Sequence, residues 1–325
     1  MRKKKPQEGS YGSEESLRVL QWEDCPHRGR QGRDHDLGLN YGTGIFEGIR
    51  GYWNGEEEQL YVFRLREHFE RFLRNCRVLL IELPYTVAEL CEATLELLQR
   101  EGFRTDVYIR PLAYKSGEEI GVRLHDLESQ CTIFALPFGE YDKPGGARVM
   151  ISSWRRLDDN AIPPRSKIIG AYVNSALAKT EAHLHGFDDA LMLCQDGHVS
   201  EGSAANLFIV RDGTLITPPV TQEILEGITR ATILQLAEDL GIETLERPID
   251  RSELYVADEA FLCGTAVGLV PIIEVDHRQV GDGAPGPIST QLKKLYQAVV
   301  RGKELRYRRW CTPVYRAAVP SGAIP

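Results

Sequence analysis

No stretch of this sequence approaches the ~20 consecutive apolar residues that a membrane-spanning helix needs. The basic residues Arg2 to Lys5 are followed by a polar stretch, 6–16, so a signal peptide would lack its apolar region. Lys and Arg, 39 in all, are outnumbered by 47 Asp and Glu, and the net charge of −8 argues against nucleic acid, which binds basic surfaces. We therefore expect a cytoplasmic protein that binds neither membranes nor nucleic acid.

Closely spaced cysteine pairs are missing as well. The seven cysteines, at positions 25, 76, 91, 131, 194, 263 and 311, include no C-x-x-C pair. Most of them have apolar neighbours, which favours free buried thiols in a reducing compartment over disulfides or a metal site. We expect no bound metal ion, and the sequence has no internal repeat or low-complexity tract.

The chain does have enough apolar residues, 42% of 325, to form one large or two moderate domains. Strand patterns interleaved with a few helical patterns predict an α+β fold. A stretch that contains Pro144-Gly145-Gly146 is the best candidate for a linker. The predicted divisions are an atypical, partly disordered N-terminal segment (1–37), a small α/β domain (38–138), a linker (139–146), a large domain (147–310) and a C-terminal tail (311–325).

The small domain opens with Y-G-T-G-I-F-E-G-I-R-G-Y-W, whose apolar residues at 45–53 predict one buried strand. Asn54-Gly55 predicts a hairpin turn into a second strand at 60–63. An amphipathic pattern predicts a helix over 66–81, with Leu80 on its apolar face. The other predicted elements of this domain are a helix from a capping box at Thr86 and Glu89 to a stop at Gly102, and strands at 107–114 and 131–136.

The large domain contains one compact supersecondary unit, residues 163–208. Lys167 precedes a helical pattern that runs from Tyr172 to a stop at Gly186. The residues expected on one apolar side of this helix are Val173, Ala176, Leu177 and Leu184.

A buried strand at 190–194 follows, turns at Asp196-Gly197, and returns to Glu201. A lysine before a helix and a carboxylate after a hairpin therefore flank one unit. A lysine that acts as a nucleophile toward a cofactor needs a charged partner for that cofactor. The other predicted elements are strands at 148–153, 243–247, 259–263 and 272–275, a hairpin at Asp212-Gly213, and helices at 228–240 and 289–301.

The pattern S-K-x-x-G-x-Y-x-N-S, followed by S-E-G-x-x-x-N-L-F, G-I-T-R and G-T-A, resembles the branched-chain amino-acid aminotransferases. These are fold-type IV enzymes that use pyridoxal 5'-phosphate (PLP). The resemblance runs from about Tyr41 to about Trp310 and implies a D-amino-acid aminotransferase-like fold, with a small α/β domain and a larger, β-barrel-like domain that binds PLP. It implies transfer of the amino group of leucine, isoleucine or valine to 2-oxoglutarate through a Schiff base on Lys167, giving branched-chain 2-oxo acids and glutamate.

The resemblance also assigns cofactor contacts. Lys167 is the catalytic lysine, Glu201 pairs with the pyridine nitrogen, and Tyr172 bonds to the phenolic oxygen of PLP. The phosphate is expected at a helix start, where free N–H groups and the helix dipole favour a dianion; for Thr229 an N-terminal cap is the alternative role. Arg71, in R-E-H-F-E-R, offers a bidentate grip on the phosphate, with a surface salt bridge as its alternative. The implied cofactor-binding residues are Arg71, Lys167, Tyr172, Glu201, Leu225, Gly227, Ile228, Thr229 and Thr265.

For the substrate, the distinctive motif is Tyr108-Ile109-Arg110-Pro111, in which the tyrosine and the arginine alternate to one face of a strand. An arginine on an otherwise apolar strand needs a partner, and a substrate carboxylate would be one. The implied substrate-binding residues are Tyr41, Phe46, Tyr108, Arg110, Tyr141, Thr265 and Ala266.

Two features depart from the family pattern. The apolar strand that usually ends in a histidine before Y-G-T is not recognisable, and Asn40 stands before Tyr41. S-A-A-N-L-F replaces the common S-G-E-N-L-F, which leaves the hydrogen bonding of that loop open.

Three functions remain open at this point. The first is the branched-chain aminotransferase, acting on small-molecule amino acids and 2-oxo acids as at least a homodimer that lends pocket residues across its interface. The second is another enzyme of the same fold: a D-amino-acid or (R)-amine transaminase, or an aminodeoxychorismate lyase. The third is a non-catalytic homologue that acts as an interaction subunit, which is expected to lack the lysine or the carboxylate.

Overall fold

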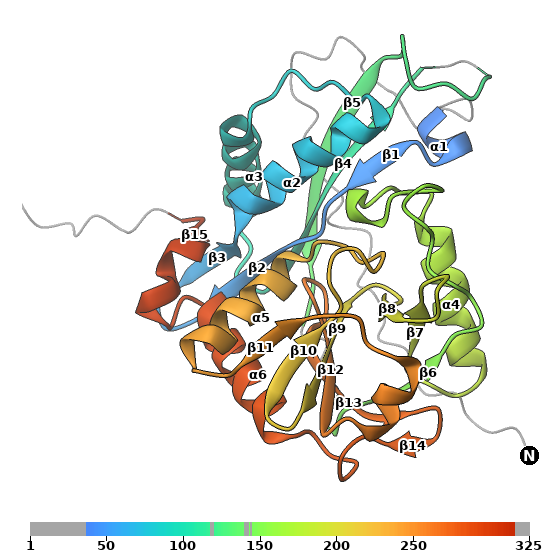
Figure 1. Cartoon of the computed structure of the whole chain (residues 1–325). Coiled ribbons are helices and arrows are strands. Elements are labelled where there is room, and N and C mark those ends of the chain that lie inside the picture. Colours follow the sequence, from blue (N-terminus) through green and yellow to red (C-terminus); the bar gives the residue numbers. More distant parts are fainter. Residues whose placement is uncertain (1–36, 118–119, 140–142, 144, 316–325) are drawn as a thin grey trace, which may run out of the picture.

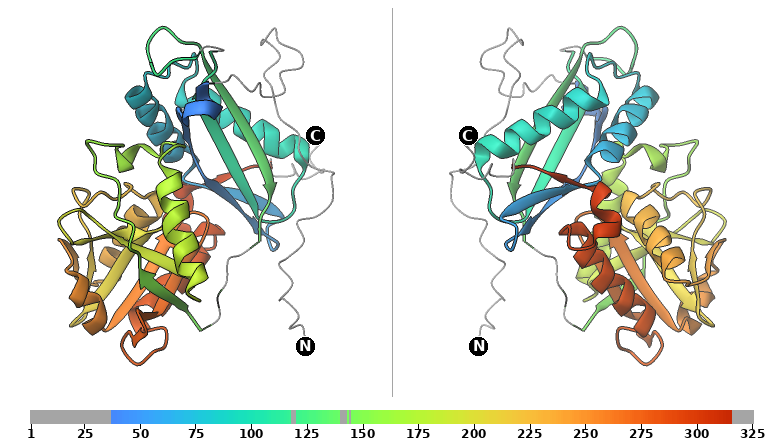
Figure 2. Two further views of the ribbon diagram at one scale, coloured as in Figure 1. Left: turned by 90° about the vertical axis from the view of Figure 1, so that its right-hand side faces the viewer. Right: turned by 90° about the vertical axis from the view of Figure 1, so that its left-hand side faces the viewer.

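The computed structural model of the protein describes residues 37–117, 120–139, 143 and 145–315. Its strands form two sheets, which Figure 1 shows one above the other. Figure 2 shows the same two layers from the sides, with helices packed against each of them. The α+β class is therefore confirmed. Most of the predicted N-terminal segment, 1–36, lies outside the described residues.

The first sheet is organised around one long strand, β4 (Val107–Lys115). β5 (Ser129–Pro137) pairs with one edge of β4, and β1 (Gly44–Phe46) and β2 (Ile49–Asn54) share its other edge in one register. The strand predicted at 45–53 is thus interrupted at Glu47 and Gly48. The Glu47 N–H donates to the Pro111 carbonyl at 2.9 Å, but proline has no N–H to donate in return.

The hairpin predicted at Asn54-Gly55 has a longer loop than the two residues suggest. Asn54 ends β2 and pairs with Gln59, the first residue of β3 (Gln59–Phe63), so four residues form the turn. The buried Asn54 side chain accepts hydrogen bonds from the N–H groups of Glu56 and Glu57 and so holds this loop.

Two helices cover one face of this sheet (Figure 1): α2 (Leu65–Cys76) and α3 (Val87–Glu101). The capping box of α3 is confirmed, because the Thr86 and Glu89 side chains each accept the other's N–H, and Gly102 ends the helix with φ 65°. The placement of Leu80 was wrong. α2 ends at Cys76, and a 3₁₀ turn followed by a left-handed Leu80 (φ 51°) turns this side chain outward to 53% exposure.

The second sheet is larger and has nine strands in the described part of the chain. They are β6 (Ala147–Ile151), β7 (Asp189–Leu193), β8 (Val199–Gly202), β9 (Asn206–Arg211), β10 (Thr214–Thr217), β11 (Thr244–Glu246), β12 (Glu259–Gly264), β13 (Gly268–Val275) and β14 (Arg278–Gln279). Its strand order is β11-β10-β9-β12-β13-β6-β7-β8, with β14 beside β13. Side chains from β6, β7, β9, β12 and β13 share one apolar core, so the sheet curls around it as part of a barrel (Figure 1).

Helices α5 (Ile228–Asp239) and α6 (Pro287–Val300) cover the outer face of this sheet, where Phe208 and Phe261 stack in their shared core. Helix α4 (Tyr172–Leu184) lies against β7 (Figure 1). The expected apolar side of α4 was wrong: Val173 is 64% exposed and Leu184 is 81% exposed. Two small buried residues, Ala178 and Ala182, pack against Ala190 and Met192 of β7 instead, because small side chains allow the helix to approach the sheet closely.

The predicted tail at 311–325 is wrong for its first five residues. β15 (Cys311–Pro313) pairs with β3, and Val314 is 1% exposed in the small-domain core. Without β15, the edge of β3 opposite β2 would have unpaired backbone N–H and C=O groups, and proteins usually cover such edges. The chain therefore returns to its first sheet after completing the second. Residues 316–325, and 140–142 and 144 of the predicted linker, lie outside the described residues.

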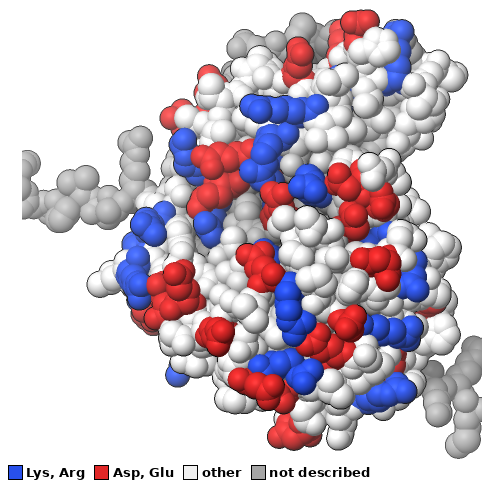
Figure 3. All heavy atoms as spheres, viewed as in Figure 1, with Lys and Arg blue, Asp and Glu red and all other residues white. Residues whose placement is uncertain are grey.

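Lys and Arg alternate with Asp and Glu over the face shown in Figure 3, without a large patch of one sign. In the described part of the chain, no helix combines the length and the apolar character needed to cross a membrane. The same residues contain no cluster of three or more His, Cys, Asp or Glu side chains suited to a metal ion. Six cysteines are described and are free thiols.

Candidate active site

A cavity of about 400 Å³ lies where the two sheets meet. It is lined by thirteen of the predicted site residues: Phe46, Arg71, Tyr108, Arg110, Lys167, Tyr172, Glu201, Leu225, Gly227, Ile228, Thr229, Thr265 and Ala266. Two others are not part of this group. Tyr41 is 41% exposed and lines a neighbouring cavity, and Tyr141 lies outside the described residues.

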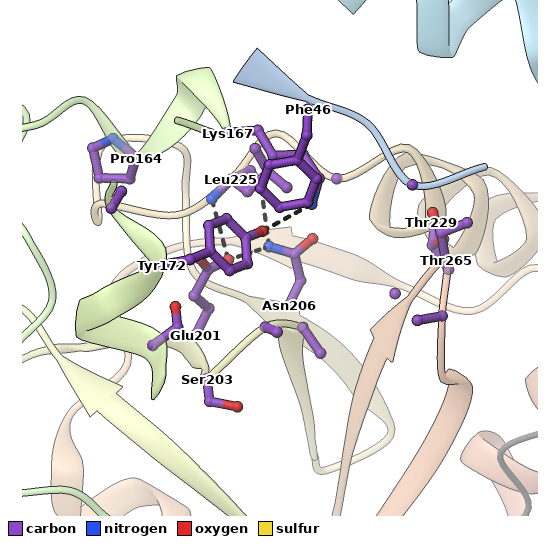
Figure 4. A pocket seen from close by; sticks show the side chains of 18 of the residues that line it. Phe46, Pro164, Lys167, Tyr172, Glu201, Ser203, Asn206, Leu225, Thr229 and Thr265 are labelled. Carbon is purple, nitrogen blue, oxygen red and sulfur yellow. Dashed lines mark hydrogen bonds between the residues drawn. The ribbon is translucent and has the colours of Figure 1, made fainter. Parts of the chain in front are cut away.

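Lys167 reaches the cavity from the segment between a 3₁₀ turn, Pro164–Ser166, and helix α4. The Lys167 carbonyl accepts a hydrogen bond from Phe46 N–H of β1, and Ile169 N–H donates to Gly44 at 2.8 Å. The residue has φ 46°, a left-handed conformation that is uncommon for a residue other than glycine and that tends to occur at functional sites. Its Nζ lies 2.8 Å from the Tyr172 hydroxyl and 4.6 Å from the centre of the Phe46 ring (Figure 4).

Glu201 is the next-to-last residue of β8 and is almost fully buried. Its Oε1 lies 2.7 Å from Nη2 of Arg156, and its Oε2 accepts from Asn206 at 2.8 Å and from the Leu225 N–H at 3.1 Å. Burial raises the pKa of Glu201, and the Arg156 charge and the Leu225 amide oppose that rise. The carboxylate thus has three donors and retains lone pairs for a further partner in the cavity.

The same network shows how the loop S-A-A-N, residues 203–206, is hydrogen-bonded. Asn206, the last residue of that motif, donates both to Glu201 and to the Leu225 carbonyl, the latter at 3.0 Å. Gly227 makes room for it, because a Cβ on Gly227 would lie 1.9 Å from Oδ1 of Asn206. Both bonds come from the Asn206 side chain and involve neither alanine of the loop.

Helix α5 points its N-terminus at the cavity. Gly227 is its N-cap, without a side-chain cap, and the Ala231 N–H makes the first bond back to Gly227. The N–H groups of Ile228 and Thr229 therefore have no acceptor within the helix and favour an anion. Thr229 is not the cap. Figure 4 shows Thr229 and Thr265 on the side of the cavity away from Glu201.

Arg71 stands beside this helix and is 4% exposed, so a surface salt bridge is not its role. Its Nε and Nη2 donate to the two oxygens of Glu47 at 2.7 and 2.8 Å, and its Nη1 donates to the Glu226 carbonyl at 2.8 Å. Of the five N–H groups of an arginine, these three bonds leave one on Nη1 and one on Nη2. Arg71 can therefore still donate twice to a phosphate.

Glu47 is fully buried and also contacts His68, whose Nδ1 lies 2.9 Å from Oε2. Burial by itself raises the pKa of Glu47, but Arg71 and His68 outweigh it and hold this pKa well below its usual range. Burial lowers the pKa of His68, against the attraction of Glu47. Glu47 is therefore ionised where it accepts from Arg71, and His68 behind it is neutral.

The other end of the cavity is lined by one face of the first sheet. Tyr108 and Arg110 lie on this face of β4, and Nη2 of Arg110 donates to the Tyr108 hydroxyl at 2.9 Å. The Arg110 guanidinium lies 4.6 Å from the centre of the Phe46 ring. Its buried Nε has no hydrogen-bond partner in the described structure. A buried donor without a partner is rare and suits a ligand that has an acceptor.

Sequence reasoning missed several residues that support these groups: Glu47, Gly48, His68, Arg156 and Asn206. Gly48 is required because a Cβ there would lie 2.1 Å from the Tyr108 hydroxyl. Asn206 and Glu47 lie inside motifs that were noticed, S-E-G-x-x-x-N and F-E-G, so their spacing could have drawn attention to them. Arg156 follows Arg155 in W-R-R-L, and nothing in that pattern shows which arginine is buried.

The residues present fit PLP. Free amides and the two remaining Arg71 donors suit a phosphate dianion at one end, and a buried carboxylate suits a protonated ring nitrogen. The lysine amine lies between them, within hydrogen-bond reach of a tyrosine.

Three comparisons with known proteins agree with this reading. The sequence model of the family described as "Amino-transferase class IV" matches residues 44–275. The "Probable branched-chain-amino-acid aminotransferase" of Aquifex aeolicus (strain VF5) is 52% identical over 279 residues, which cover 85% of this chain and 90% of that protein.

Two solved structures are also similar. A branched-chain aminotransferase from the archaeon Thermoproteus uzoniensis, solved with norvaline, has a TM-score of 0.83 and 48% identity, covering 86% of this chain and 93% of that one. A branched-chain amino acid aminotransferase from Thermobaculum terrenum in its PLP form has a TM-score of 0.85 and 41% identity, covering 92% of this chain and 96% of that one.

Proposed function

The chain belongs to the amino-transferase class IV family, and from this premise we propose that it moves the amino group of leucine, isoleucine or valine to 2-oxoglutarate. The products are branched-chain 2-oxo acids and glutamate. The observation that carries the proposal is one cavity that holds Lys167, Glu201 and the partly unpaired Arg110. The names of the similar proteins support the same activity.

PLP is the cofactor of this family, and when bound it supplies an electron sink for negative charge on the substrate Cα. Lys167 would hold it through its Nζ, and the same amine, when free, would act as the base that moves the proton at the substrate Cα. The Tyr172 hydroxyl, at 2.8 Å, orients this amine. Glu201 would pair with the ring nitrogen, since its carboxylate, fixed by Arg156 and Asn206, favours the protonated form of that nitrogen.

Two substrates of different polarity must use the same pocket in alternation. Tyr108 and the amides at Thr265 and Ala266 suit the α-carboxylate, which every substrate has. Phe46 offers an apolar surface for a branched side chain, where a carboxylate without a partner would be costly. Arg110, beside Phe46, can pair with the second carboxylate of glutamate and 2-oxoglutarate.

The other candidates have less support. A non-catalytic role does not explain why Lys167 and Glu201 line one cavity, together with the free backbone N–H groups at the start of α5. A D-amino-acid or (R)-amine transaminase, or an aminodeoxychorismate lyase, would use the same cofactor end. These enzymes differ at the substrate end, so the profile of amino donors decides between them.

We further propose that the protein is a cytoplasmic homodimer at least. Tyr41 lines a second cavity of about 740 Å³ beside exposed apolar residues, including Val78 at 44% and Val122 at 89% exposure. Ile168 lines both cavities. A second copy that covers this surface would bring Tyr41 to a substrate pocket, where the family resemblance expects it.

The test is a profile of amino donors for the wild type and for Arg110→Met, followed through the cofactor spectrum in half-reactions. We expect L-leucine, L-isoleucine, L-valine and L-glutamate to react. Arg110→Met should lose ~1.5–3 kcal/mol of glutamate recognition, or roughly one to two orders of magnitude in kcat/KM, and much less for leucine. Equal losses would reject dual recognition by Arg110, and a preference for D-amino acids or (R)-amines would reject the proposed reaction.

A further inference from the structure

We propose that Arg50 is a positioning residue that holds two segments in one arrangement. The first is the turn at Ala266, which we assign to the substrate α-carboxylate, and the second is the chain at Phe138 and Gly139, which follows β5. The inference rests on the proposed function and concerns a residue outside the main cavity. Arg50 lies on β2 and is 2% exposed. It lines a small hollow of about 50 Å³ behind the cavity, and Ala266 lines both.

The Arg50 guanidinium bonds to three carbonyl groups from two segments far apart in the sequence. Nη1 donates to the Ala266 carbonyl at 3.2 Å, and Nη2 donates to the carbonyls of Phe138 and Gly139 at 3.0 and 3.3 Å. Ala266 belongs to the turn between β12 and β13 in the large domain. Phe138 and Gly139 follow β5 and lead out of the small domain. One side chain therefore ties the two domains together directly behind the substrate pocket.

Arg50 also fixes the tyrosine on the pocket wall. It is the direct cross-strand partner of Tyr108 in the β2–β4 ladder. The guanidinium lies 4.7 Å from the centre of the Phe138 ring, and this ring packs on Tyr108 at 5.4 Å between centroids. The two groups that we assign to the α-carboxylate, the Tyr108 hydroxyl and the turn at Ala266, thus share one support.

Packing alone does not explain an arginine at this position. Nη2 lies 3.5 Å from Asp106, but the buried Nε has no hydrogen-bond partner in the described structure. An unsatisfied buried donor is destabilising, and a shorter apolar side chain would avoid it. The planar fork of an arginine can reach carbonyls on two segments at once, which a lysine ammonium does less well.

The expected consequence is a loss of carboxylate affinity that is the same for all substrates. Leucine and glutamate share the α-carboxylate, so Arg50→Met should raise KM for both by about tenfold, which corresponds to ~1.4 kcal/mol. Affinity for PLP should stay within about twofold, because the phosphate and pyridine groups lie elsewhere. Arg50→Lys should fall between Arg50→Met and the wild type. This pattern differs from that of Arg110→Met, which separates the two amino acids.

The experiment compares Arg50→Met and Arg50→Lys with Arg301→Met in the PLP-loaded protein. Arg301 is a matched control because it pairs with the same Asp106, at 2.9 Å, and bonds to the Trp53 carbonyl. The readouts are KM and kcat for L-leucine and L-glutamate, and the dissociation constant of 4-methylvaleric acid, a leucine analogue without the amino group. Thermal unfolding of each variant separates a loss of folding from a loss of affinity.

The proposal is supported if the Arg50 variants bind 4-methylvaleric acid and both amino acids more weakly than the wild type does, while Arg301→Met binds them about as well as the wild type. Equal effects of Arg50→Met and Arg301→Met, or a loss that follows thermal stability, would assign Arg50 a structural role only and overturn it. If the wild type binds 4-methylvaleric acid but transfers no amino group, the proposed function fails while the role of Arg50 is still measured by binding.

Discussion

The two ends of the cavity differ in how their charged groups are satisfied. At the cofactor end the charges already have partners within the fold: Glu201 has Arg156, and Arg71 has Glu47. At the substrate end Arg110 bonds only to a tyrosine hydroxyl among its described hydrogen bonds, and its Nε has no partner. The cofactor end is thus built as part of the folded core, whereas the substrate end has binding capacity that a ligand must complete.

This difference predicts how substitutions act. A buried charge whose partner is removed destabilises the protein itself, by ~3–5 kcal/mol in known cases. A group that waits for a ligand can be removed with little effect on folding and a direct effect on affinity. Changes at the cofactor end should therefore alter stability and cofactor retention together, and changes at the substrate end should alter KM.

The largest expected effect is on catalysis at the junction of the two ends. Lys167→Ala should lower the transamination rate by ~10⁴-fold, the upper range for a positioned proton-transfer group, while PLP still binds weakly and without a covalent bond. Lys179→Ala is the control, because that amine bonds to Asp188 and Asp189 outside the cavity. The measurement is single-turnover rate together with the visible absorbance on adding PLP and its loss on borohydride treatment. Comparable turnover of leucine by Lys167→Ala would point to another lysine.

Arg71→Ala tests the cofactor end. Because it leaves Glu47 buried without its cation, we expect ~3–5 kcal/mol lower stability in addition to weaker PLP retention. Arg71→Lys keeps a charge beside Glu47 and should retain most of the stability, but it loses the planar fork and with it ~1.5–3 kcal/mol of phosphate binding. Denaturant unfolding and PLP titration measure the two quantities separately. Equal PLP affinity in Arg71→Lys and the wild type would exclude a bidentate grip of Arg71 on the phosphate.

Gly48→Ala tests the substrate end. The added methyl group must displace the Tyr108 hydroxyl, which lies 2.1 Å from the Cβ position. Overpacking of this kind costs ~1–3 kcal/mol, and we expect it mainly as a higher KM for leucine and glutamate with unchanged PLP affinity. Gly55→Ala in the β2–β3 turn is the control, since its Cβ would meet no atom closer than 3.6 Å. An unchanged KM in Gly48→Ala would show that the Tyr108 hydroxyl does not bind substrate.

The smallest effect is a pH dependence of stability at the cofactor end. His68 has a lowered pKa, so below its ordinary value of 6.5 the unfolded chain takes up a proton that the folded protein resists. Stability should fall with decreasing pH there by at most ~1.4 kcal/mol per pH unit. Glu47, whose pKa is also lowered, adds a loss as pH falls below its ordinary 4.5.

His68→Gln keeps a hydrogen-bond donor near Glu47 but cannot titrate. Urea unfolding of the cofactor-free protein at several pH values between 7 and 5 gives the free energy of unfolding as a function of pH. This free energy should therefore fall less steeply with decreasing pH in the variant than in the wild type. If the free energy of unfolding depends on pH in the same way in the variant and the wild type, His68 has the same pKa in the folded and the unfolded protein.

Local signals predicted most of the fold. The capping box at Thr86, the turn at Asp212-Gly213 and the stop at Gly102 depend on contacts within a few residues, and each occurs as expected. The exposed side of α4 and the return of β15 to the first sheet were not predicted. Both depend on which surfaces meet in space, and neither small residues on a helix nor a three-residue strand carries that information locally.

The sequence by itself determined most of the elements, the family and the cofactor chemistry, because the lysine, the carboxylate and the helix start belong to motifs whose order can be read along the chain. Only the tertiary structure decided which residues support them. Arg156 reaches Glu201, and Arg50 reaches Ala266 across 216 positions of sequence, through buried hydrogen bonds between segments that have no fixed spacing. It also decided that Tyr41 lies outside the cavity, because the packing of the two sheets, and not the motif, sets which side chains face it.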